Sequence, residues 1–285
     1  MSATFETRNL HHCFGGIQGY YQHPSTVIGL PMRFSVYQPP QAIQQRVPVL
    51  FFLAGLTCTE ETFMIKAGAQ RYAAELGLIL VTMDTSPRQT GIAGETDAWD
   101  FGAGAGFYLD ATAEPWSKYY RMESYITQEL RNIIVNQFPA DPRRIGIFGH
   151  SMGGHGAITL ALRHPDIFRS VSAFAPICAP MQCPWGQKAF LNYLGKNQEN
   201  WQKYDATALI AAGHRVPELF IDQGLNDQFL TDQLHPHLLE NACAKAGQNL
   251  TLRYRQDYDH SYYFISTFIK EHLEYHCNAL FNLSY

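Results

Sequence analysis

The sequence lacks the clusters of positive charge that bind nucleic acid or anionic membranes. Its 21 Lys and Arg residues are scattered among 25 Asp and Glu residues, and the net charge is -4. Nucleic-acid binding rests on a basic patch or stripe, so we expect no nucleic-acid partner. No apolar run approaches the roughly 20 residues of a membrane span, and the start, MSATFETRNLHHC, does not resemble a signal peptide. We therefore expect a cytoplasmic protein without a membrane partner.

Motifs for metals and dinucleotide cofactors are also missing. No H-E-x-x-H occurs, and no G-x-G-x-x-G follows a predicted strand. The six cysteines are thinly spread, and Cys178 and Cys183 have no second pair at zinc-finger spacing. Thinly spread cysteines in a chain without an export signal are typical of free thiols. We expect no metal, no cofactor and no disulfide framework.

What the sequence does contain is an alternation of apolar runs and helical patterns. With 285 residues, of which 46% are hydrophobic, the chain can bury one large core, so we expect a single domain over 1–285. Continuous apolar runs are typical of parallel strands covered on both faces. Residues 32–37 instead alternate and stop at Pro39-Pro40, which predicts an antiparallel edge. The predicted parallel strands are 47–53, 78–83, 144–148, 170–176, 219–222 and 250–254.

Helical patterns lie between these runs. They cover residues 60–76, 121–138, 154–163, 229–246 and 262–277. Strand and helix therefore alternate, which predicts an α/β fold of the α/β-hydrolase type: a mainly parallel, doubly wound sheet with an antiparallel N-terminal edge. Residues 84–120 show no clear period but are rich in glycine and aromatic residues. We interpret this segment as a long ordered loop that covers the active site.

The most informative motif is Gly149-His150-Ser151-Met152-Gly153, a G-x-S-x-G between a predicted strand and a predicted helix. In that context the motif predicts a nucleophile elbow, a sharp turn that holds the Ser151 hydroxyl clear of the sheet. The amide of Met152 would then begin the following helix and point at the group that the serine attacks. His150 and His155 lie close in sequence, but we expect the elbow to direct their side chains elsewhere, as packing groups.

An acid and a base are expected after the serine, in the order Ser, Asp, His. Asp227 lies in the loop that leaves the strand at 219–222, whereas Asp222 falls inside that strand and Asp205 precedes it. Of the 12 histidines, His260 lies in the loop after the last strand, which returns above the elbow in this topology. Ser151, Asp227 and His260 are therefore the predicted catalytic residues.

Two further loops are candidates for the site. The loop at 54–59 follows a buried strand, where a hydrolase carries its second oxyanion donor, and Leu56 N–H is the candidate. An ordinary turn with Gly55 at positive φ is the alternative. Trp185 and Lys188 follow the strand at 170–176 and are candidate pocket residues, against the alternative of a solvent-facing turn with a packed tryptophan.

The chain resembles the S-formylglutathione hydrolases, the esterase D family, over nearly its whole length. The strings that carry the resemblance, in collinear order, are Gly55-Leu56-Thr57-Cys58-Thr59, Asp84-Thr85-Ser86-Pro87-Arg88, Trp99-Asp100-Phe101-Gly102, Gly104-Ala105-Gly106-Phe107-Tyr108, Phe148-Gly149-His150-Ser151-Met152-Gly153-Gly154-His155-Gly156, Ser172-Ala173-Phe174-Ala175-Pro176-Ile177, Cys183-Pro184-Trp185-Gly186, Ile221-Asp222-Gln223-Gly224 and Tyr258-Asp259-His260-Ser261-Tyr262-Tyr263-Phe264. Such a set is far more specific than G-x-S-x-G alone.

The resemblance implies a triad and an oxyanion hole at the positions already chosen, and a serine thioesterase without a cofactor. It implies S-formylglutathione as the small-molecule substrate, cleaved to formate and glutathione, and small aryl esters as further substrates. Cys58 matches a family cysteine near the active site that is associated with sensitivity to thiol reagents and is not the nucleophile; a small buried side chain is its other interpretation. Members of the family are often dimers, so a homodimer is possible here.

Glutathione carries two carboxylates, so a cation at the pocket mouth would help to bind it. Arg88, Lys188 and Lys66 are the candidates. Two other functions stay open: a broad short-chain carboxylesterase without a glutathione-specific role, and a non-catalytic binding protein of the same fold. The second would be expected to have lost Ser151 or His260.

Overall fold

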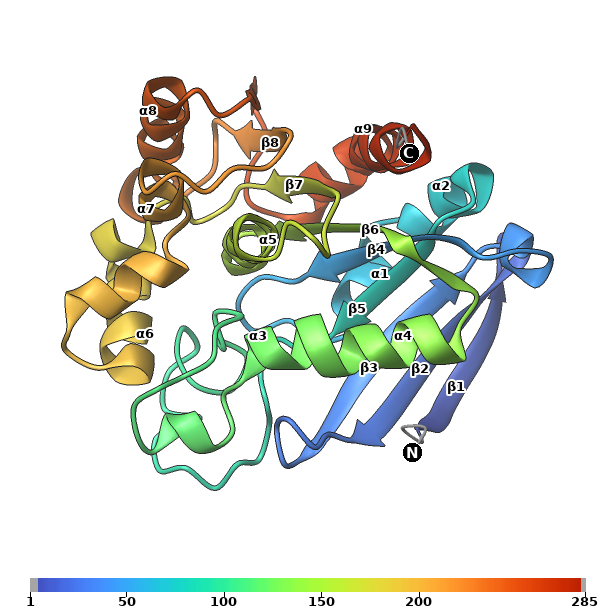
Figure 1. Cartoon of the computed structure of the whole chain (residues 1–285), viewed down its shortest axis with the longest axis horizontal. Helices are drawn as coiled ribbons and strands as arrows, with labels where there is room; N and C mark the ends of the chain where they lie inside the picture. The colour runs from blue at the N-terminus through green and yellow to red at the C-terminus, as the bar shows by residue number, and fades with distance from the viewer. Residues whose placement is uncertain (1–4, 283–285) are drawn as a thin grey trace.

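One mixed β-sheet runs through the protein, whose computed structural model describes residues 5–282. The described strands follow the spatial order β1-β2-β3-β5-β4-β6-β7-β8-β9 (Figure 1). Pairing is antiparallel from β1 to β5 and parallel from β5 to β9. The strands are β1 (Glu6–Cys13), β2 (Gly16–Pro24), β3 (Pro31–Gln38), β4 (Val47–Leu53), β5 (Ile79–Met83), β6 (Ala140–His150), β7 (Ser170–Phe174), β8 (Leu219–Gly224) and β9 (Leu250–Arg255). The predicted α/β sheet with an antiparallel N-terminal part is confirmed.

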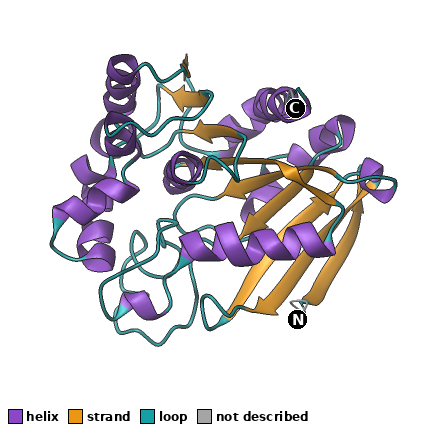
Figure 2. Ribbon diagram, in the orientation of Figure 1, coloured by secondary structure: helices purple, strands orange, loops and turns teal. Residues whose placement is uncertain are grey.

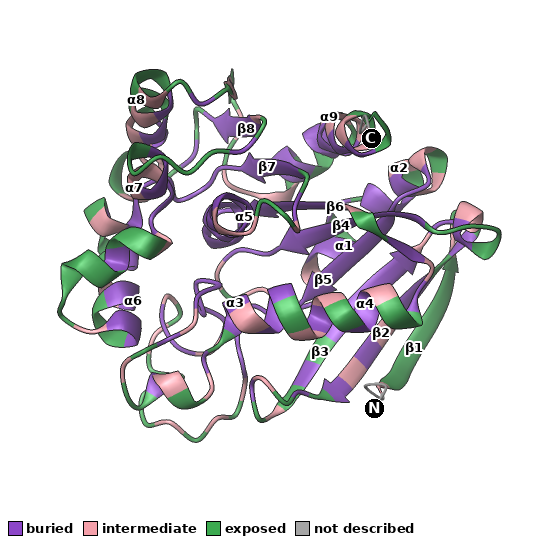
Figure 3. Cartoon of the chain, in the orientation of Figure 1, coloured by how far each residue is buried: buried purple, intermediate pink, exposed green. Residues whose placement is uncertain are grey.

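The antiparallel part is larger than predicted. The strand expected at the edge, β3, lies inside the sheet between β2 and β5, and the edge is β1. β1 was not predicted because seven of its eight residues are exposed, so no apolar alternation marks a buried face. Figure 3 shows β1 in green along the margin of the sheet. β6 also begins earlier than predicted, because Asp141-Pro142 is accommodated by a register shift opposite Val47 and Val49.

Helices cover both faces of the parallel strands. α5 (Met152–Arg163) and α4 (Arg131–Gln137) lie on one side of the sheet, while α2 (Ala69–Leu76) and α9 (Tyr262–Phe281) lie on the other (Figure 1). The strands between these layers are fully buried, as in β4, β5 and β7. Their continuous apolar runs therefore follow from burial on both faces. α5 is buried over nearly its whole length, which places it in the core (Figure 3).

Two predicted helices are interrupted, and a third is continuous but contains a π-helical segment. The helix at 60–76 divides into α1 (Thr62–Lys66) and α2, because Gly68 adopts a φ of 65° between them. The helix at 121–138 consists of α3 (Met122–Ser124), a π-helical segment (Tyr125–Leu130) and α4. The helix at 229–246 consists of a π-helical segment (Leu230–Leu234) and α8 (Pro236–Ala246), with His235 at a φ of 47° before the proline. Periodicity does not detect such single-residue breaks.

The segment at 84–120 is irregular apart from short turns, and it fills the lower left of Figure 2 in teal. Its buried aromatic residues Tyr108, Trp116 and Tyr120 order it against the rest of the chain. Tyr193 extends this packing, because its hydroxyl accepts a hydrogen bond from Gly102 N–H and donates one to the Ala105 carbonyl. Tyr193 belongs to α6 (Pro184–Leu194), a helix that the sequence did not predict. α7 (Ala206–Ala211) follows it, and short 3₁₀ turns cover Pro40–Ile43, Trp116–Lys118, Pro180–Gln182 and Gln198–Tyr204.

Candidate active site

Ser151 occupies a sharp turn between β6 and α5. Its backbone has φ 57° and ψ -120°, a strained combination for a residue with a side chain. The turn is held by the Ser151 N–H, which donates to the Phe174 carbonyl at 3.0 Å, and by the Ser151 carbonyl, which accepts from His155 N–H. The predicted strand, turn and helix around this serine are therefore confirmed.

The glycines of the motif allow the close approach that this turn requires. A Cβ atom on Gly149 would lie 2.2 Å from the Gly153 carbonyl oxygen, and one on Gly153 would lie 2.0 Å from the Leu53 carbonyl oxygen. Both distances are far below van der Waals contact. Any larger residue would push α5 away from the ends of β4 and β6.

His260 and Asp227 meet above this turn, from loops that follow β9 and β8. His260 Nδ1 and Asp227 Oδ2 lie 2.5 Å apart, and both side chains are largely or fully buried. Asp227 is itself oriented, because its Oδ1 accepts from Phe229 N–H at 2.8 Å and its Oδ2 from Gln223 Nε2 at 3.3 Å. A carboxylate held in this way can fix the tautomer and orientation of an imidazole.

Ser151 and His260 line one small pocket with a volume of about 120 Å³. Its wall consists of Gly55, Leu56, Cys58, Trp99, His150, Ser151, Trp185, Phe229, His260 and Tyr262. No hydrogen bond joins Ser151 to His260 within the described chain. Hydrogen bonds of this kind are commonly loose in a free enzyme and tighten when substrate binds.

Two backbone amides border the serine. Met152 is the first residue of α5, and Leu56 lies in the pocket wall at the end of β4. The Leu56 N–H finds no acceptor among residues 5–282, so it is free to donate to a ligand. The alternative of an ordinary turn with Gly55 at positive φ is wrong in its detail, because Thr57 is the residue in this loop with positive φ, at 69°.

Aromatic side chains form one side of the pocket. The ring centroid of Phe229 lies 5.0 Å from that of His260 and 4.7 Å from that of Trp185. The ring centroid of Trp185 in turn lies 5.4 Å from that of Trp99. Trp185 belongs to α6 and is buried, whereas Trp99 comes from the loop at 84–120 and is 56% exposed. Trp185 lines the pocket as the sequence suggested, but it belongs to a helix that the sequence did not predict.

His150 is a pocket residue that sequence reasoning assigned to packing elsewhere. Its ring centroid lies 4.4 Å from that of His260 and 6.1 Å from that of Tyr262. Burial, reinforced by the neighbouring His260, lowers the pKa of His150 well below its ordinary value, so the ring is neutral. His150, Trp99, Phe229 and Tyr262 were all missed as lining residues. Only their nearness in sequence to other candidates could have pointed to them.

Cys58 also lines the pocket, and its thiol is protonated at neutral pH. Burial raises the pKa of Cys58, and the nearby Thr62, Tyr262 and Lys66 reduce this rise without cancelling it. A raised pKa lowers the fraction of thiolate, which is the reactive form.

Two of the cations predicted to bind substrate are paired with carboxylates and lie outside this pocket wall. Arg88 binds Asp84 at 2.8 Å and lines a different, polar pocket. Lys188 Nζ lies 2.6 Å from Asp100 Oδ1, beside Trp99. Lys66 lies 5.8 Å from the ring centroid of Tyr262, which does line the pocket. A role of Arg88, Lys188 or Lys66 in binding the substrate stays a prediction. The carboxylate partners of Arg88 and Lys188 were not predicted, because side-chain contacts depend on the fold.

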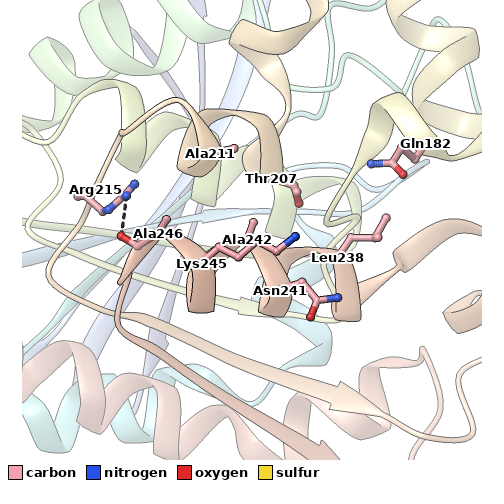
Figure 4. Close-up of a pocket in the computed structure, with 9 residues that line it drawn as sticks. All are labelled: Gln182, Thr207, Ala211, Arg215, Leu238, Asn241, Ala242, Lys245 and Ala246. Carbon is pink, nitrogen blue, oxygen red and sulfur yellow. Dashed lines mark hydrogen bonds between the residues drawn. The ribbon is translucent and has the colours of Figure 1, made fainter.

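A larger pocket, of about 530 Å³, lies between α7 and α8 (Figure 4). It contains no serine, cysteine or histidine, and its Arg215 donates to the Ala246 carbonyl. Size therefore does not identify the catalytic pocket here. Residues 5–282 also hold no group of three or more His, Cys, Asp or Glu side chains arranged for a metal, and no helix among them could cross a membrane. All six cysteines are free.

Comparison with known proteins shows the family to which the chain belongs. The Esterase family model, described as "Putative esterase", matches residues 25–275. An S-formylglutathione hydrolase of Rattus norvegicus is 51% identical over 271 residues, which cover 94% of this chain and 96% of the relative. The structure of an S-formylglutathione hydrolase from Agrobacterium tumefaciens has a TM-score of 0.95 and 49% identity, over 96% of this chain and 99% of that one.

A more distant structure, the serine hydrolase FphF of Staphylococcus aureus, shares the fold at a TM-score of 0.73 and 21% identity, over 92% of this chain and 99% of that one. The resemblance noted in the sequence is thus confirmed over almost the full length. The chain belongs to the Esterase family and, within it, to the S-formylglutathione hydrolases.

Proposed function

We propose that this protein hydrolyses S-formylglutathione to formate and glutathione, with Ser151 as nucleophile. The observation that carries the proposal is the pocket of about 120 Å³ that contains Ser151 beside the His260–Asp227 pair. A formyl group has a single carbon and needs little space, so a narrow pocket suits it. The relatives that share about half of their residues with this chain are named S-formylglutathione hydrolases.

In the proposed first step, His260 takes the Ser151 proton as Oγ attacks the thioester carbonyl. The negative charge that develops on the carbonyl oxygen is bound by the N–H groups of Leu56 and Met152. The carbon–sulfur bond then breaks, His260 gives its proton to the sulfur, and the thiol leaves. Asp227 stabilises the imidazolium that exists between these events. A formyl ester of Ser151 remains.

In the second step, His260 takes a proton from water, whose oxygen attacks the formyl carbon. The bond from that carbon to Ser151 Oγ breaks, and His260 returns the proton to Ser151. Formate is released and the enzyme is restored. Both steps use the same oxyanion donors, so the loop at 54–59 acts in each.

The leaving thiol would lie along the aromatic side of the pocket, near Trp185 and Trp99. Lys66 is the candidate cation for a glutathione carboxylate. It projects over Tyr262 at the pocket wall and forms no ion pair with the residues described in this structure. A homodimer and a cytoplasmic location stay predictions.

The test is steady-state hydrolysis of S-formylglutathione and of p-nitrophenyl acetate by the wild type and by Ser151→Ala. We expect kcat/KM to favour S-formylglutathione strongly, and both activities to disappear in the variant while its circular dichroism spectrum is unchanged. Equal or better turnover of the aryl ester would instead favour the broad carboxylesterase. Full activity of Ser151→Ala would remove this serine from the mechanism.

A further inference from the structure

Arg88 is bound to the oxyanion loop through a backbone carbonyl. Its Nη2 donates to the Cys58 carbonyl at 3.1 Å and to Asp84 Oδ1 at 2.8 Å, while its Nε lies 3.1 Å from both oxygens of Asp84. A planar guanidinium can contact a carboxylate and a carbonyl together in a fixed geometry. The Cys58 carbonyl is thereby fixed to the beginning of the loop at 84–120.

The oxyanion loop is held at several points around Leu56. Thr85 Oγ1 donates to the same Cys58 carbonyl at 2.8 Å. Thr57 N–H donates to the Gly104 carbonyl at 2.9 Å, and the fully buried hydroxyl of Tyr108 donates to the Ala54 carbonyl at 2.8 Å. These contacts lie on both sides of Leu56, whose own N–H stays free.

The loop needs such support because its backbone is strained. Thr57 has a φ of 69°, in the left-handed region that β-branched residues avoid. Strained residues keep their conformation only where the surrounding contacts over-determine it. If the Cys58 carbonyl were released, the peptide units around Thr57 could relax, and the Leu56 N–H would turn away from its direction.

We propose that Arg88 is a positioning residue for the oxyanion hole: by holding the Cys58 carbonyl, it keeps Leu56 N–H aimed at the substrate. The proposal rests on the proposed serine-hydrolase mechanism. Arg88 itself would not touch the substrate. Its loss should weaken the binding of the transition state more than that of the ester, since the developing oxyanion is what the amide binds.

The first test compares Arg88→Met with a matched control, Arg144→Met. Arg144 also binds a nearby carboxylate, Asp141 at 2.8 Å, and a distant backbone carbonyl, that of Arg46 at 3.2 Å, but it lies away from the pocket. With p-nitrophenyl acetate, we expect Arg88→Met to lower kcat by about ten- to a hundredfold and to keep KM within about threefold of the wild-type value. Complete removal of an oxyanion donor lowers kcat by about 10²–10³, and a misdirected donor should cost less than that. Arg144→Met should keep the wild-type kcat.

A transition-state analogue gives a readout that a merely structural role would not change. Phenylboronic acid forms a tetrahedral adduct with a reactive serine, and one of its oxygens takes the place of the oxyanion. Its inhibition constant should rise in Arg88→Met by about the factor lost in kcat. A folded Arg88→Met with kcat and inhibition constant within twofold of wild type would overturn the proposal, as would an equal fall of kcat in Arg144→Met.

Thr85→Val is the second variant, in case Arg88→Met does not fold. It removes the other donor to the Cys58 carbonyl with almost no change of shape, and we expect a fall in kcat of about three- to tenfold at constant KM. An unchanged kcat in this variant would contradict the role of that carbonyl. All assays use the aryl ester, so a wild type that cleaves it but not S-formylglutathione would overturn the proposed substrate and leave this inference standing.

Discussion

At the residue scale, two aspartates near the end of β8 have opposite chemical surroundings. Asp227 faces His260 in the pocket region, whereas the side chain of Asp222 is fully buried against Arg253, Arg255 and His272. Burial alone would raise the pKa of Asp222, but hydrogen bonds from these three partners outweigh it and lower the pKa to about 2. Asp222 is therefore an ionised structural group, and Asp227 is free to orient the histidine.

We expect Asp227→Asn and Asp222→Asn to fail in different ways. Asp227→Asn should lower kcat by about 10³–10⁴, because an amide no longer stabilises the imidazolium and favours the wrong tautomer. Asp222→Asn should lower the free energy of unfolding by about 3 kcal/mol, because it removes the buried negative charge that pairs with Arg253 and Arg255, which keep Glu271 as their other carboxylate partner. Steady-state kinetics and urea unfolding of both variants provide the measurement.

The contrast between the two variants is the control. Each is isosteric with its parent, so a change in size explains neither effect. If Asp227→Asn kept wild-type kcat, or if Asp222→Asn were inactive at full stability, the assignment of the two carboxylates would have to be exchanged.

At the element scale, the turn between β6 and α5 depends on how closely the helix approaches the neighbouring strands. Gly153 packs against the end of β4, where an added Cβ would lie 2.0 Å from a backbone oxygen. Backbone cannot rotate away as a flexible side chain can, so the whole of α5 would have to shift. Since α5 carries Met152 and begins at Ser151, such a shift would reach the proposed nucleophile.

Gly153→Ala should therefore cost more than the substitution of a glycine in open space. We expect Gly153→Ala to lower the free energy of unfolding by more than about 3 kcal/mol, which is the upper end of the usual destabilisation when a core is overpacked. Gly68→Ala is the matched comparison: nothing lies within 4 Å of its added Cβ, but its φ is 65°, so the cost should be about 1–2 kcal/mol. Thermal and urea unfolding of both variants measure the difference; equal stabilities would contradict the close packing.

At the scale of the whole molecule, several buried histidines make the fold sensitive to acid. His155 and His276 are buried in α5 and α9. Burial lowers the pKa of His155 to about 4, and burial together with the nearby His272 lowers that of His276 well below its ordinary value. Both lowered pKa values mean that the neutral form of the imidazole ring is favoured inside the folded protein. The two helices lie on opposite faces of the sheet, so acid acts on both layers.

The free energy of unfolding should fall as the pH falls from about 6.5 to about 4. In that window an unfolded histidine binds a proton whereas folded His155 does not, so this residue contributes a slope of about 1.4 kcal/mol per pH unit. His155→Phe should lose that contribution. Urea unfolding between pH 8 and pH 4 measures how the free energy of unfolding changes with pH. The free energy at pH 8, where histidine is neutral in both states, reports any change in packing caused by the substitution. A slope identical to that of the wild type would contradict a buried neutral His155.

Much of the fold was predictable because its signals are local. A continuous apolar run predicts a strand buried on both faces, and the runs that became β4, β5 and β7 were found in this way. β1 was missed because an edge strand exposed on both faces has no such pattern. The breaks at Gly68 and His235 escaped for a related reason, since one residue in the left-handed region barely alters the period of its neighbours.

The sequence by itself determined the order of the elements, the glycine-framed turn at Ser151 and the loops in which Asp227 and His260 lie, since each depends on spacing along the chain. The catalytic roles of these residues stay predictions. Only the tertiary structure decided the partners: Arg88 on the Cys58 carbonyl, Lys188 on Asp100 and His150 against His260. Side-chain partners are set by contacts between segments far apart in sequence, which local patterns do not encode.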